Sequence, residues 1–511
     1  MLASTSGDRS KVPKGKNILK SKGVWKLKYT DTGDIDKYKF RLTACGYSQI
    51  YGSDFSETHA GVVSMPVFRL FCGLVAALNL KTRLYDVGNA FLECDLEEEL
   101  YMQLPDYLGG DVVRLRKAIY GLKQSGMLFV KTMATYLKSL GFQQSKTEPC
   151  MFTLITRIDD APPEWKGWGY ITVLTYIDDV PVASNSDSLI NWLGGALKSR
   201  FRKVTDEPLR WFLANRVKIS RGTVSIDQEQ YCLYIIDKFR TYLVRYYSNT
   251  NGSLKTKTTP MRPGLVLSKE QSPKNDTERA EMARLPYAQL VGCLMYLANG
   301  TRVDIIVATS NCARFMANPG MQHWLCALEI LLYLMNNPGR CVTYRDLGPE
   351  RNLLVSAECD ASFADNPDTA HSRYGVVIYM QGAFAVAKQG WMKNVRLNTM
   401  DAETGALAQA TIQVLPVRRY LEDWGFPQRD PTHIGEDNNA ALICSHSWVA
   451  TKRARHIHVD HHFVREHQLE SKNIWVHRVP SDENSSDMLS KNVTPPLLKK
   501  HSSTMMGESN L

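Results

Sequence analysis

Residues 174–180 read Leu-Thr-Tyr-Ile-Asp-Asp-Val, and this short stretch decides the expected fold. Residues 170–177 and 180–183 are rich in β-forming side chains, so they predict a hairpin with Asp178 and Asp179 at its tip. Adjacent carboxylates repel each other unless a cation or a proton lies between them, and aspartates that hold two Mg²⁺ ions suit phosphoryl transfer. The stretch alone leaves a solvated hairpin turn open as the alternative.

A metal site of that kind is expected to have a third carboxylate, and Asp86 supplies one upstream. It lies in Leu-Tyr-Asp-Val-Gly-Asn-Ala-Phe at residues 84–91, a β-rich stretch in which it is the lone acid among apolar neighbours. A second acidic pair, at residues 159–160, precedes the loop formers Ala-Pro-Pro, and no strand is expected beside it. We therefore assign chemistry to Asp86, Asp178 and Asp179 and none to the second pair.

Length and composition restrict the class of protein. The chain has 511 residues, of which 44% are hydrophobic, and this length suits about three or four globular domains. Its longest apolar runs, such as residues 70–80, stop well short of the ~20 residues that cross a bilayer, and residues 1–16 are polar and basic. Neither a membrane span nor a signal peptide is expected. The 11 cysteines include no Cys-x-x-Cys, which favours core thiols in a reducing intracellular setting.

The net charge of +10 is concentrated near the start of the chain. Residues 1–41 contain 11 Lys or Arg and 4 Asp. Such a basic segment favours a polyanionic partner, which binds with release of counterions and loses affinity as the salt concentration rises. For residues 1–16 the alternative is a solvated, partly disordered tail.

Alternating polar and apolar residues predict a β-hairpin over residues 25–44, with a turn at residues 32–34 and cations on one face. Lys39 and Arg41 are two of these cations. Apolar residues at helical spacing predict scaffold helices further along the chain. These helices are expected at residues 67–80, directly before the Asp86 strand, and at residues 128–140, 188–201 and 228–239.

The C-terminal part of the chain changes to strands and helices that end or begin with acids. A strand that ends near Asp360 is followed by a hairpin partner at residues 374–379 and by a helix that opens with Asp-Ala-Glu at residues 401–403. A short strand then leads to Asp437, and Asp487 starts a last helix. Carboxylates at strand ends and helix starts can converge on one edge of a sheet, so these acids predict a second acidic cluster.

Two of these motifs resemble the metal-binding motifs of reverse transcriptases, namely Asp-Val-Gly-Asn-Ala-Phe at residues 86–91 and Tyr-Ile-Asp-Asp at residues 176–179. Leu-Glu-Glu-Glu-Leu-Tyr-Met at residues 96–102 and Ala-Ile-Tyr-Gly-Leu-Lys-Gln-Ser at residues 118–125 resemble blocks of the copia-type (Pseudoviridae) LTR-retrotransposon polymerases. Such blocks follow the family's order nearly from one end of the chain to the other.

The resemblance implies an α+β multidomain fold, with a right-hand polymerase of fingers, palm and thumb, a helical connection and an RNase H-like α/β domain. The expected domains are a basic disordered tail at 1–16, reverse transcriptase fingers, palm and thumb at 17–247, a linker and helical connection at 248–350, an RNase H-like domain at 351–494 and a tail at 495–511.

The resemblance also implies two sites that each hold two Mg²⁺ ions. In the second position of the RNase H site Asp401 is a rival, and we prefer Glu403 because Ala-Leu-Ala at residues 406–408 continues the helix behind it. The implied ligands of the polymerase site are Asp86, Asp178 and Asp179, and those of the RNase H site are Asp360, Glu403, Asp437 and Asp487.

Four residues are assigned to the substrate by the same resemblance. Lys39 and Arg41 would bind the β- and γ-phosphates of the incoming triphosphate, with strand-surface charge as the alternative. Gln124 would line the nucleotide pocket, although by itself it is a polar loop residue. Phe91 would pack beneath the sugar and exclude a 2′-hydroxyl, provided that the strand ends and the chain turns at residues 87–89. Gly88 favours such a turn, because glycine readily adopts left-handed conformations. The alternative for Phe91 is an ordinary core position.

The implied function is that of an RNA-directed DNA polymerase with an RNase H activity that hydrolyses the RNA strand of RNA–DNA hybrids. The expected partners are an RNA template, a DNA primer, RNA–DNA hybrids and deoxynucleoside triphosphates, with no membrane. Integrase or capsid proteins of the same element are further candidate partners. The expected location is intracellular, in cytoplasmic virus-like particles or in the nucleus.

The alternative function is that of a decayed or co-opted copy that binds nucleic acid without catalysis. Four departures from the family pattern favour this alternative, at Cys45, Gly126, Met127 and Ala214. All seven implied metal ligands are nevertheless present, which favours an active enzyme.

Overall fold

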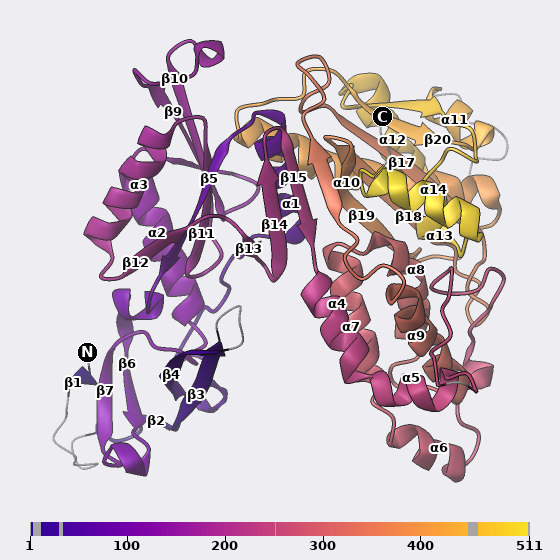
Figure 1. The fold of residues 1–511 in the computed structure, drawn as a ribbon. Coiled ribbons are helices and arrows are strands. Elements are labelled where there is room, and N and C mark those ends of the chain that lie inside the picture. The colour runs from indigo at the N-terminus through magenta and orange to yellow at the C-terminus, as the bar shows by residue number, and fades with distance from the viewer. Residues whose placement is uncertain (1, 4–11, 30–33, 251, 448–457, 509–511) are drawn as a thin grey trace. The chain divides into compact units, whose positions relative to one another are not determined.

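The computed structural model describes residues 2–3, 12–29, 34–250, 252–447 and 458–508 (Figure 1). It divides into two compact units, of which the first comprises Met1–Val63 and Lys81–Leu209 and the second comprises Ser64–Leu80 and Arg210–Leu511. Both units contain helices and sheets, which confirms the α+β multidomain class, whereas the expected domain boundaries stay predictions. Within the described residues, no helix has the length and the apolar character needed to cross a membrane.

The first unit is built on a six-stranded antiparallel sheet. In spatial order its strands are β12 (Val204–Glu207), β5 (Lys81–Val87), β11 (Asp179–Ser184), β10 (Trp168–Leu174), β9 (Met151–Arg157) and β8 (Gln143–Gln144). Apolar strand residues such as Val87 and Val182 share one buried core with helices α2 (Ser125–Ser139) and α3 (Asp187–Arg200). The helices predicted at residues 128–140 and 188–201 are thereby confirmed.

Two smaller sheets belong to the same unit. The hairpin predicted over residues 25–44 is present as β3 (Ser21–Tyr29) and β4 (Ile35–Ala44). The basic segment 1–16 lies largely outside the described residues. The other sheet contains, in spatial order, β1 (Leu2–Ala3), β7 (Val112–Lys117), β6 (Asp95–Gln103) and β2 (Ile18–Leu19), and single 3-10 turns occur at η2 (Gly46–Ser48), η3 (Ala90–Glu93), η4 (Asp106–Leu108) and η5 (Pro163–Trp165).

The second unit begins with helix α1 (Met65–Ala77), the buried helix predicted at residues 67–80. It packs against a four-stranded antiparallel sheet, where the rings of Phe68 and Phe212 lie 4.9 Å apart. In spatial order the strands of this sheet are β13 (Trp211–Phe212), β14 (Asn215–Ser220), β15 (Thr223–Asp227) and β16 (Val342–Arg345). Helices that follow along the chain are α4 (Glu229–Lys238), α5 (Arg240–Tyr247), α6 (Asp276–Ala283), α7 (Tyr287–Gly300), α8 (Ile306–Ala313) and α9 (Met321–Leu334), with 3-10 turns η6 (Lys269–Gln271) and η7 (Val303–Ile305).

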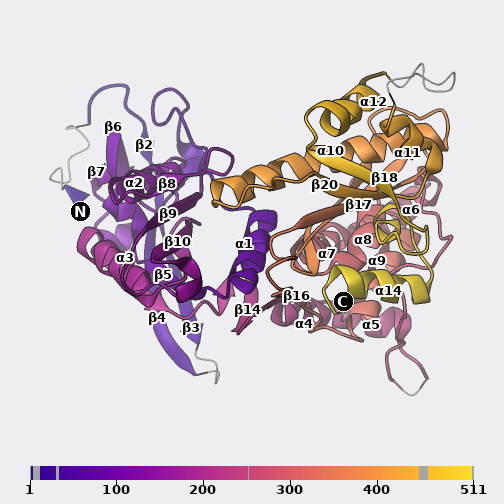
Figure 2. The same cartoon turned by 90° about the horizontal axis from the view of Figure 1, so that it is seen from above.

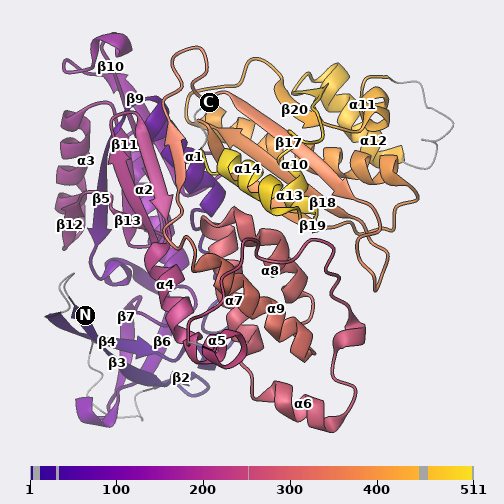
Figure 3. The same cartoon turned by 45° about the vertical axis from the view of Figure 1, so that its right-hand side comes forward.

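The C-terminal part of the second unit is a five-stranded mixed sheet. In spatial order its strands are β19 (Ala383–Trp391), β18 (Arg373–Met380), β17 (Val355–Ser362), β20 (Thr432–Glu436) and β21 (Ile474–Arg478). The first three are antiparallel neighbours, whereas β20 and β21 continue the sheet in parallel. Helix α10 (Thr399–Asp423) packs along β17 and β18 (Figures 2 and 3). The predicted order of strand, hairpin partner, helix and short strand is confirmed. The helix that begins at Asp487 is not the last one, because α14 (Pro495–Met505) follows it within the predicted tail.

Shorter helices complete this part of the chain. They are α11 (Asn439–Ser445), α12 (His458–Arg465), the π-helical turn η8 (Glu466–Glu470), α13 (Asp487–Ser490) and α14 (Pro495–Met505).

The acidic pair at residues 159–160 lies in the loop between β9 and β10, so the expectation that no strand flanks it is wrong. Asp160 accepts hydrogen bonds of 2.8 Å from the hydroxyl groups of Ser186 and Ser188 at the start of α3. A carboxylate is stabilised there by the helix dipole. The structure thus gives Asp160 a structural partner and leaves the pair without a chemical role.

Candidate active sites

The Asp178–Asp179 pair lies at the turn between β10 and β11, as predicted. Tyr176 and Asp179 exchange backbone hydrogen bonds of 2.8 and 3.1 Å, so only Ile177 and Asp178 form the turn. Ile177 has a φ of 53°, a left-handed conformation that β-branched residues rarely adopt and that hairpin turns usually assign to Gly. Backbone strain of this kind is found where a fold must hold functional groups in a fixed place.

The register of β5 and β11 brings the third acid to the same turn. Asp86 on β5 is the direct partner of Asp179 on β11, and the backbone N–H of Val87 donates a 2.9 Å hydrogen bond to the carbonyl of Asp178. All three acids are half-buried. Across the described residues, however, these three do not bring one oxygen each within 4.8 Å of one another. Side-chain rotation must therefore precede the sharing of one ion.

Burial and like charge act together on these carboxyl groups. Burial raises the pKa of Asp178, and the nearby Asp86 adds to the increase, whereas the positive charges of Lys39 and Arg41 oppose it. Burial also raises the pKa of Asp179 to about 6, with further contributions from Asp178 and Asp86. Burial and neighbouring negative charge disfavour the ionised form of these carboxyl groups, and a bound divalent cation would stabilise it.

Lys39 and Arg41 reach this site from β4. Both cations lower the pKa of Asp178, and the guanidinium group of Arg41 lies over the ring of Tyr120, 4.8 Å from its centroid. Tyr120 in turn contacts Phe91 edge-on, with the ring centroids 4.7 Å apart. The structure therefore brings Lys39 and Arg41 close to Asp178, and it connects Phe91 to Arg41 through the ring of Tyr120.

The chain turns between Asp86 and Phe91, as a role for Phe91 beneath the sugar requires. Strand β5 ends at Val87, Asn89 has a φ of 60°, and η3 begins at the next residue. The left-handed residue is thus Asn89 rather than Gly88, which is consistent with the tolerance of Asn for this conformation. Phe91 is only partly buried and packs against the core of the first unit.

Gln124, the fourth implied substrate residue, is fully buried. Its amide nitrogen donates a 2.9 Å hydrogen bond to the carbonyl of Asp54, and its amide oxygen accepts one of 2.9 Å from Gln49. Both ends of the amide therefore have protein partners, and contact with a nucleotide stays a prediction.

Four predicted acids of the second unit converge on one place. Asp360 lies on β17, Glu403 on α10, Asp437 directly after β20, and Asp487 at the first residue of α13. One oxygen each of Asp360, Asp437 and Asp487 lie within 4.8 Å of one another, and the same is true of Glu403, Glu436 and Asp437. Because Asp437 belongs to both trios, the structure brings all four predicted acids together.

Glu436 was missed in the sequence. It is the last residue of β20 and stands next to Asp437, and the carboxylates of both residues reach the cluster. The available signal was an adjacent acidic pair at a strand end, the same signal that marked Asp178 and Asp179.

The cluster is buried and only partly neutralised. The ammonium group of Lys491 lies 2.8 Å from Asp487 and 3.8 Å from Asp360. Burial raises the pKa of Asp360 to about 7, although Lys491 opposes the shift. Burial and neighbouring carboxylates also raise the pKa values of Glu403 and Glu436.

The donor set fits a hard divalent cation such as Mg²⁺. All candidate ligand atoms are carboxylate oxygens, which Mg²⁺ prefers. Among the described residues, Oε2 of Glu403 is buried and has no hydrogen-bond partner. A buried carboxylate oxygen of this kind is costly unless a cation or a proton satisfies it.

Asp401, the rival of Glu403, is engaged elsewhere. It accepts hydrogen bonds of 3.0 Å from Arg396 and from the backbone N–H of Leu397. Arg396 also pairs with Asp460 on α12, at 2.8 Å. The structure therefore places Glu403, and not Asp401, within the acidic cluster.

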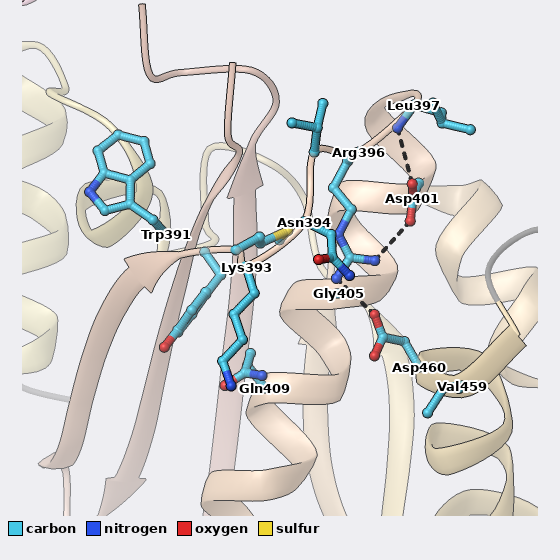
Figure 4. Close-up of a pocket in the computed structure, with 13 residues that line it drawn as sticks. Trp391, Lys393, Asn394, Arg396, Leu397, Asp401, Gly405, Gln409, Val459 and Asp460 are labelled. Carbon is cyan, nitrogen blue, oxygen red and sulfur yellow. Dashed lines mark hydrogen bonds and ion pairs between the residues drawn. The ribbon is translucent and has the colours of Figure 1, made fainter. Parts of the chain in front are cut away.

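A cavity of about 690 Å³ lies beside this arginine, between the end of β19 and the start of α10 (Figure 4). Trp391, Lys393, Asn394 and Gln409 line it together with Arg396. Aromatic, cationic and amide side chains are the groups that stack on bases and hold the sugar–phosphate backbone of nucleic acids.

Comparison with known families identifies the class of protein that this fold and these acids define. Residues 8–251 match the family described as reverse transcriptase (RNA-dependent DNA polymerase). Residues 8–251 therefore carry the reverse transcriptase domain, and most of the chain is similar to the Pol polyproteins of copia-type retrotransposons.

The relatives that support this assignment are polyproteins. The chain is 30% identical over 487 residues to the Retrovirus-related Pol polyprotein from transposon TNT 1-94 of Nicotiana tabacum. The aligned residues make up 94% of this chain and 35% of that protein. It is 29% identical over 486 residues to the Retrovirus-related Pol polyprotein from transposon RE2 of Arabidopsis thaliana, and the alignment covers 94% of this chain and 31% of that protein. The chain thus spans about a third of the length of these relatives.

Solved structures show weaker likenesses. The foamy viral protease-reverse transcriptase in complex with double-stranded DNA gives a TM-score of 0.44 at 10% identity, with 86% of this chain and 63% of that chain covered. The ribonuclease LC11-RNase H1 gives a TM-score of 0.22 at 16% identity, with 27% and 91% covered.

Proposed function

We propose that this chain is an RNA-directed DNA polymerase with a separate RNase H activity, as expected from its similarity to copia-type Pol proteins. The observation that carries the polymerase proposal is the pairing of Asp86 with Asp179, next to Asp178 in a strained turn. The proposed substrates are an RNA template, a DNA primer and deoxynucleoside triphosphates.

In the polymerase site Asp86, Asp178 and Asp179 would hold two Mg²⁺ ions. When bound, these ions would align the primer 3′-oxygen with the α-phosphate and neutralise the charge that develops during transfer. The three carboxylates supply the negative charge that binds the ions, and the rigid register of β5 and β11 fixes two of the three at the backbone. Preorganisation of this kind lowers the cost of assembling the site.

Lys39 and Arg41 would bind the triphosphate of the incoming nucleotide. Arg41 is held by its contact with Tyr120, and a fork-shaped guanidinium group can bind two phosphate oxygens at once. Phe91, which also contacts Tyr120, would lie beneath the sugar. This arrangement would couple phosphate binding to the selection of deoxyribose through one aromatic neighbour.

In the RNase H-like site Asp360, Glu403, Asp437 and Asp487 would hold two Mg²⁺ ions for hydrolysis of the RNA strand in a hybrid. Lys491 lies against Asp360 and Asp487 and would offset part of the negative charge of these two side chains. The cavity lined by Trp391 and Lys393 would receive part of the hybrid beside this site.

Primer extension by the purified chain tests the polymerase proposal. Wild-type protein should extend a labelled DNA primer on an RNA template in the presence of Mg²⁺, and Asp178→Asn should abolish extension while leaving template binding intact, since binding depends on backbone charge. Asp159→Asn is the matched control, because Asp159 belongs to an exposed acidic pair in a loop of the same unit. Undiminished extension by Asp178→Asn would refute the assignment.

Cleavage of a labelled RNA strand tests the RNase H proposal. The protein should cut RNA in an RNA–DNA hybrid and leave single-stranded RNA and RNA duplex intact. A protein that binds these nucleic acids but neither extends a primer nor cuts a hybrid would instead support the decayed or co-opted copy.

A further inference from the structure

We propose that Glu436 is a metal ligand of the RNase H-like site, so that this site uses five carboxylates and holds one of its two ions with Glu403, Glu436 and Asp437. The inference rests on the proposed function, because it concerns the same cluster. It adds a ligand to the four acids that the sequence pattern indicates.

The position of Glu436 is fixed by the sheet. It is the last residue of β20, and its backbone lies opposite that of Arg478 in the parallel strand β21. Glu436 is 0% exposed. One of its carboxylate oxygens accepts a 3.0 Å hydrogen bond from the backbone N–H of Asn438, and the other lies 3.4 Å from the thiol of Cys359. A carboxylate has about four acceptor positions, so both oxygens can still bind a cation.

Glu403 provides an independent sign that this place takes a ligand. Its side chain is 4% exposed, and its Oε2 is buried without a hydrogen-bond partner among the described residues. The same carboxylate is within 4.8 Å of an oxygen of Glu436 and of Asp437. The carboxylates of Glu436 and Asp437 thus lie close to a buried carboxylate group of which one oxygen has no hydrogen-bond partner among the described residues.

The two groups of three acids differ in whether a cationic side chain pairs with them. The first group is Asp360, Asp437 and Asp487, and the second is Glu403, Glu436 and Asp437. Lys491 pairs with Asp487 and Asp360 of the first trio. In the part of the chain that the structure describes, no Lys or Arg forms an ion pair with Glu403 or Glu436. Buried charges are normally paired or coordinate metals, so the second trio is the one that depends on an added cation.

Metal binding by the full chain tests this assignment without any measurement of activity. In a background with Asp86, Asp178 and Asp179 all changed to Asn, Mn²⁺ binding to the RNase H-like site is measured by isothermal titration calorimetry. We expect two Mn²⁺ ions to bind this background. Adding Glu436→Gln should weaken one of them by at least about tenfold, or about 1.4 kcal/mol, and leave the other within about twofold.

A folding check and one further variant separate the possible outcomes. Gln at position 436 keeps the size and can still accept the hydrogen bond from Asn438, and circular dichroism checks that the protein remains folded. Glu422→Gln, on the exposed surface of α10, is the matched control and should leave both affinities unchanged. Unchanged binding of both ions to the Glu436→Gln protein would overturn the role of Glu436 alone. Absence of Mn²⁺ binding in the background protein would overturn the metal site as a whole.

Discussion

Asp179 lies directly opposite Asp86 in the antiparallel pair of β11 and β5. Like charges at directly opposed positions destabilise an antiparallel sheet, and the adjacent Asp178 adds a third carboxyl group. The turn that carries Asp178 also contains a β-branched residue in a left-handed conformation. Local features that lower stability in this way are expected at functional sites.

The first prediction concerns the stability of the metal-free protein. The pKa of Asp179 is raised to about 6 in the fold, above its ordinary unfolded value of ~3.9. A raised pKa means that the stability present below about pH 4 is lost as the pH rises through about 6. Asp179→Asn removes this loss, so it should stabilise the metal-free protein at pH 8 by about 1 to 3 kcal/mol and have little effect at pH 4.

Thermal unfolding in the presence of a chelator measures both values. Added Mg²⁺ should raise the melting temperature of the wild type more than that of the variant, because ligands that bind only the folded state stabilise it. A variant that is less stable than the wild type at pH 8 without metal would contradict this account.

The second prediction concerns the choice of sugar. If Phe91 lies beneath the sugar, Phe91→Val should raise incorporation of ribonucleotides relative to deoxyribonucleotides by at least about tenfold, equivalent to ~1.4 kcal/mol. The reason is steric, since a closely packed ring leaves no room for a 2′-hydroxyl. Single-nucleotide extension with each triphosphate gives the ratio. An unchanged ratio in a folded, active variant would show that Phe91 is an ordinary core residue and does not select the sugar.

The third prediction concerns Arg396. A Cβ atom added at Gly405 would lie 2.9 Å from Nη2 of Arg396, the arginine that joins Asp401 to Asp460. Gly→Ala within a helix normally stabilises by about 1 kcal/mol. Gly405→Ala should lose that gain and lower cleavage of the hybrid, because the displaced arginine no longer fixes the segment before Glu403.

Gly292→Ala is the control for this experiment. Gly292 is also in a helix, α7, and its added Cβ would meet nothing within 4 Å. It should therefore raise the melting temperature and leave cleavage unchanged. Equal stabilisation by Gly405→Ala and Gly292→Ala would mean that the side chain of Arg396 can move aside without loss of stability.

The fourth prediction concerns a buried ion pair in the helical part of the second unit. Asp304 is fully buried and pairs with Arg302 at 2.8 Å and with Arg340 at 3.3 Å, and Tyr333 donates a further hydrogen bond. Despite burial, these partners hold the pKa of Asp304 below its ordinary value. Asp304→Ala should therefore cost about 3 to 5 kcal/mol of unfolding free energy by urea titration, because it removes the carboxylate that pairs with the buried Arg302.

The pH dependence of this pair has the opposite sign to that of Asp179. A lowered pKa contributes stability above the unfolded value, and this stability is lost as the pH falls. The exposed Asp276, at the start of α6, is the comparison, and Asp276→Ala should change stability by less than about 1 kcal/mol. A similarly small effect of Asp304→Ala would show that the buried ion pair contributes little to the free energy of unfolding.

Local patterns in the sequence were sufficient for the polymerase hairpin. Alternating β-forming residues and an Asp-Asp turn indicated β10 and β11, and the apolar surroundings of Asp86 indicated β5. The register that sets Asp86 opposite Asp179 depends on pairing between segments almost a hundred residues apart, which no local pattern reports. Glu436 was missed for a similar reason, since only the end of β20 decides that both adjacent acids reach one cluster.

Other details depended on tertiary contacts as well. Asn89, not Gly88, takes the left-handed conformation, because Asn also tolerates it and the sequence does not say which residue the turn uses. The burial of Gln124 depends on hydrogen bonds to Gln49 and Asp54, which lie 75 and 70 residues away in the sequence. The strand beside Asp159 was overlooked because Pro and Ala residues next to it dominated the local pattern.

The central claim is that the chain has two carboxylate sites, each responsible for one reaction. It is tested most directly by one assay that contains a labelled DNA primer on a differently labelled RNA template, so that extension and RNA cleavage are read from the same sample. The account predicts that Asp178→Asn abolishes extension and retains cleavage of a preformed hybrid, whereas Asp437→Asn abolishes cleavage and retains extension. Loss of both reactions in either folded variant, or of neither, would contradict it.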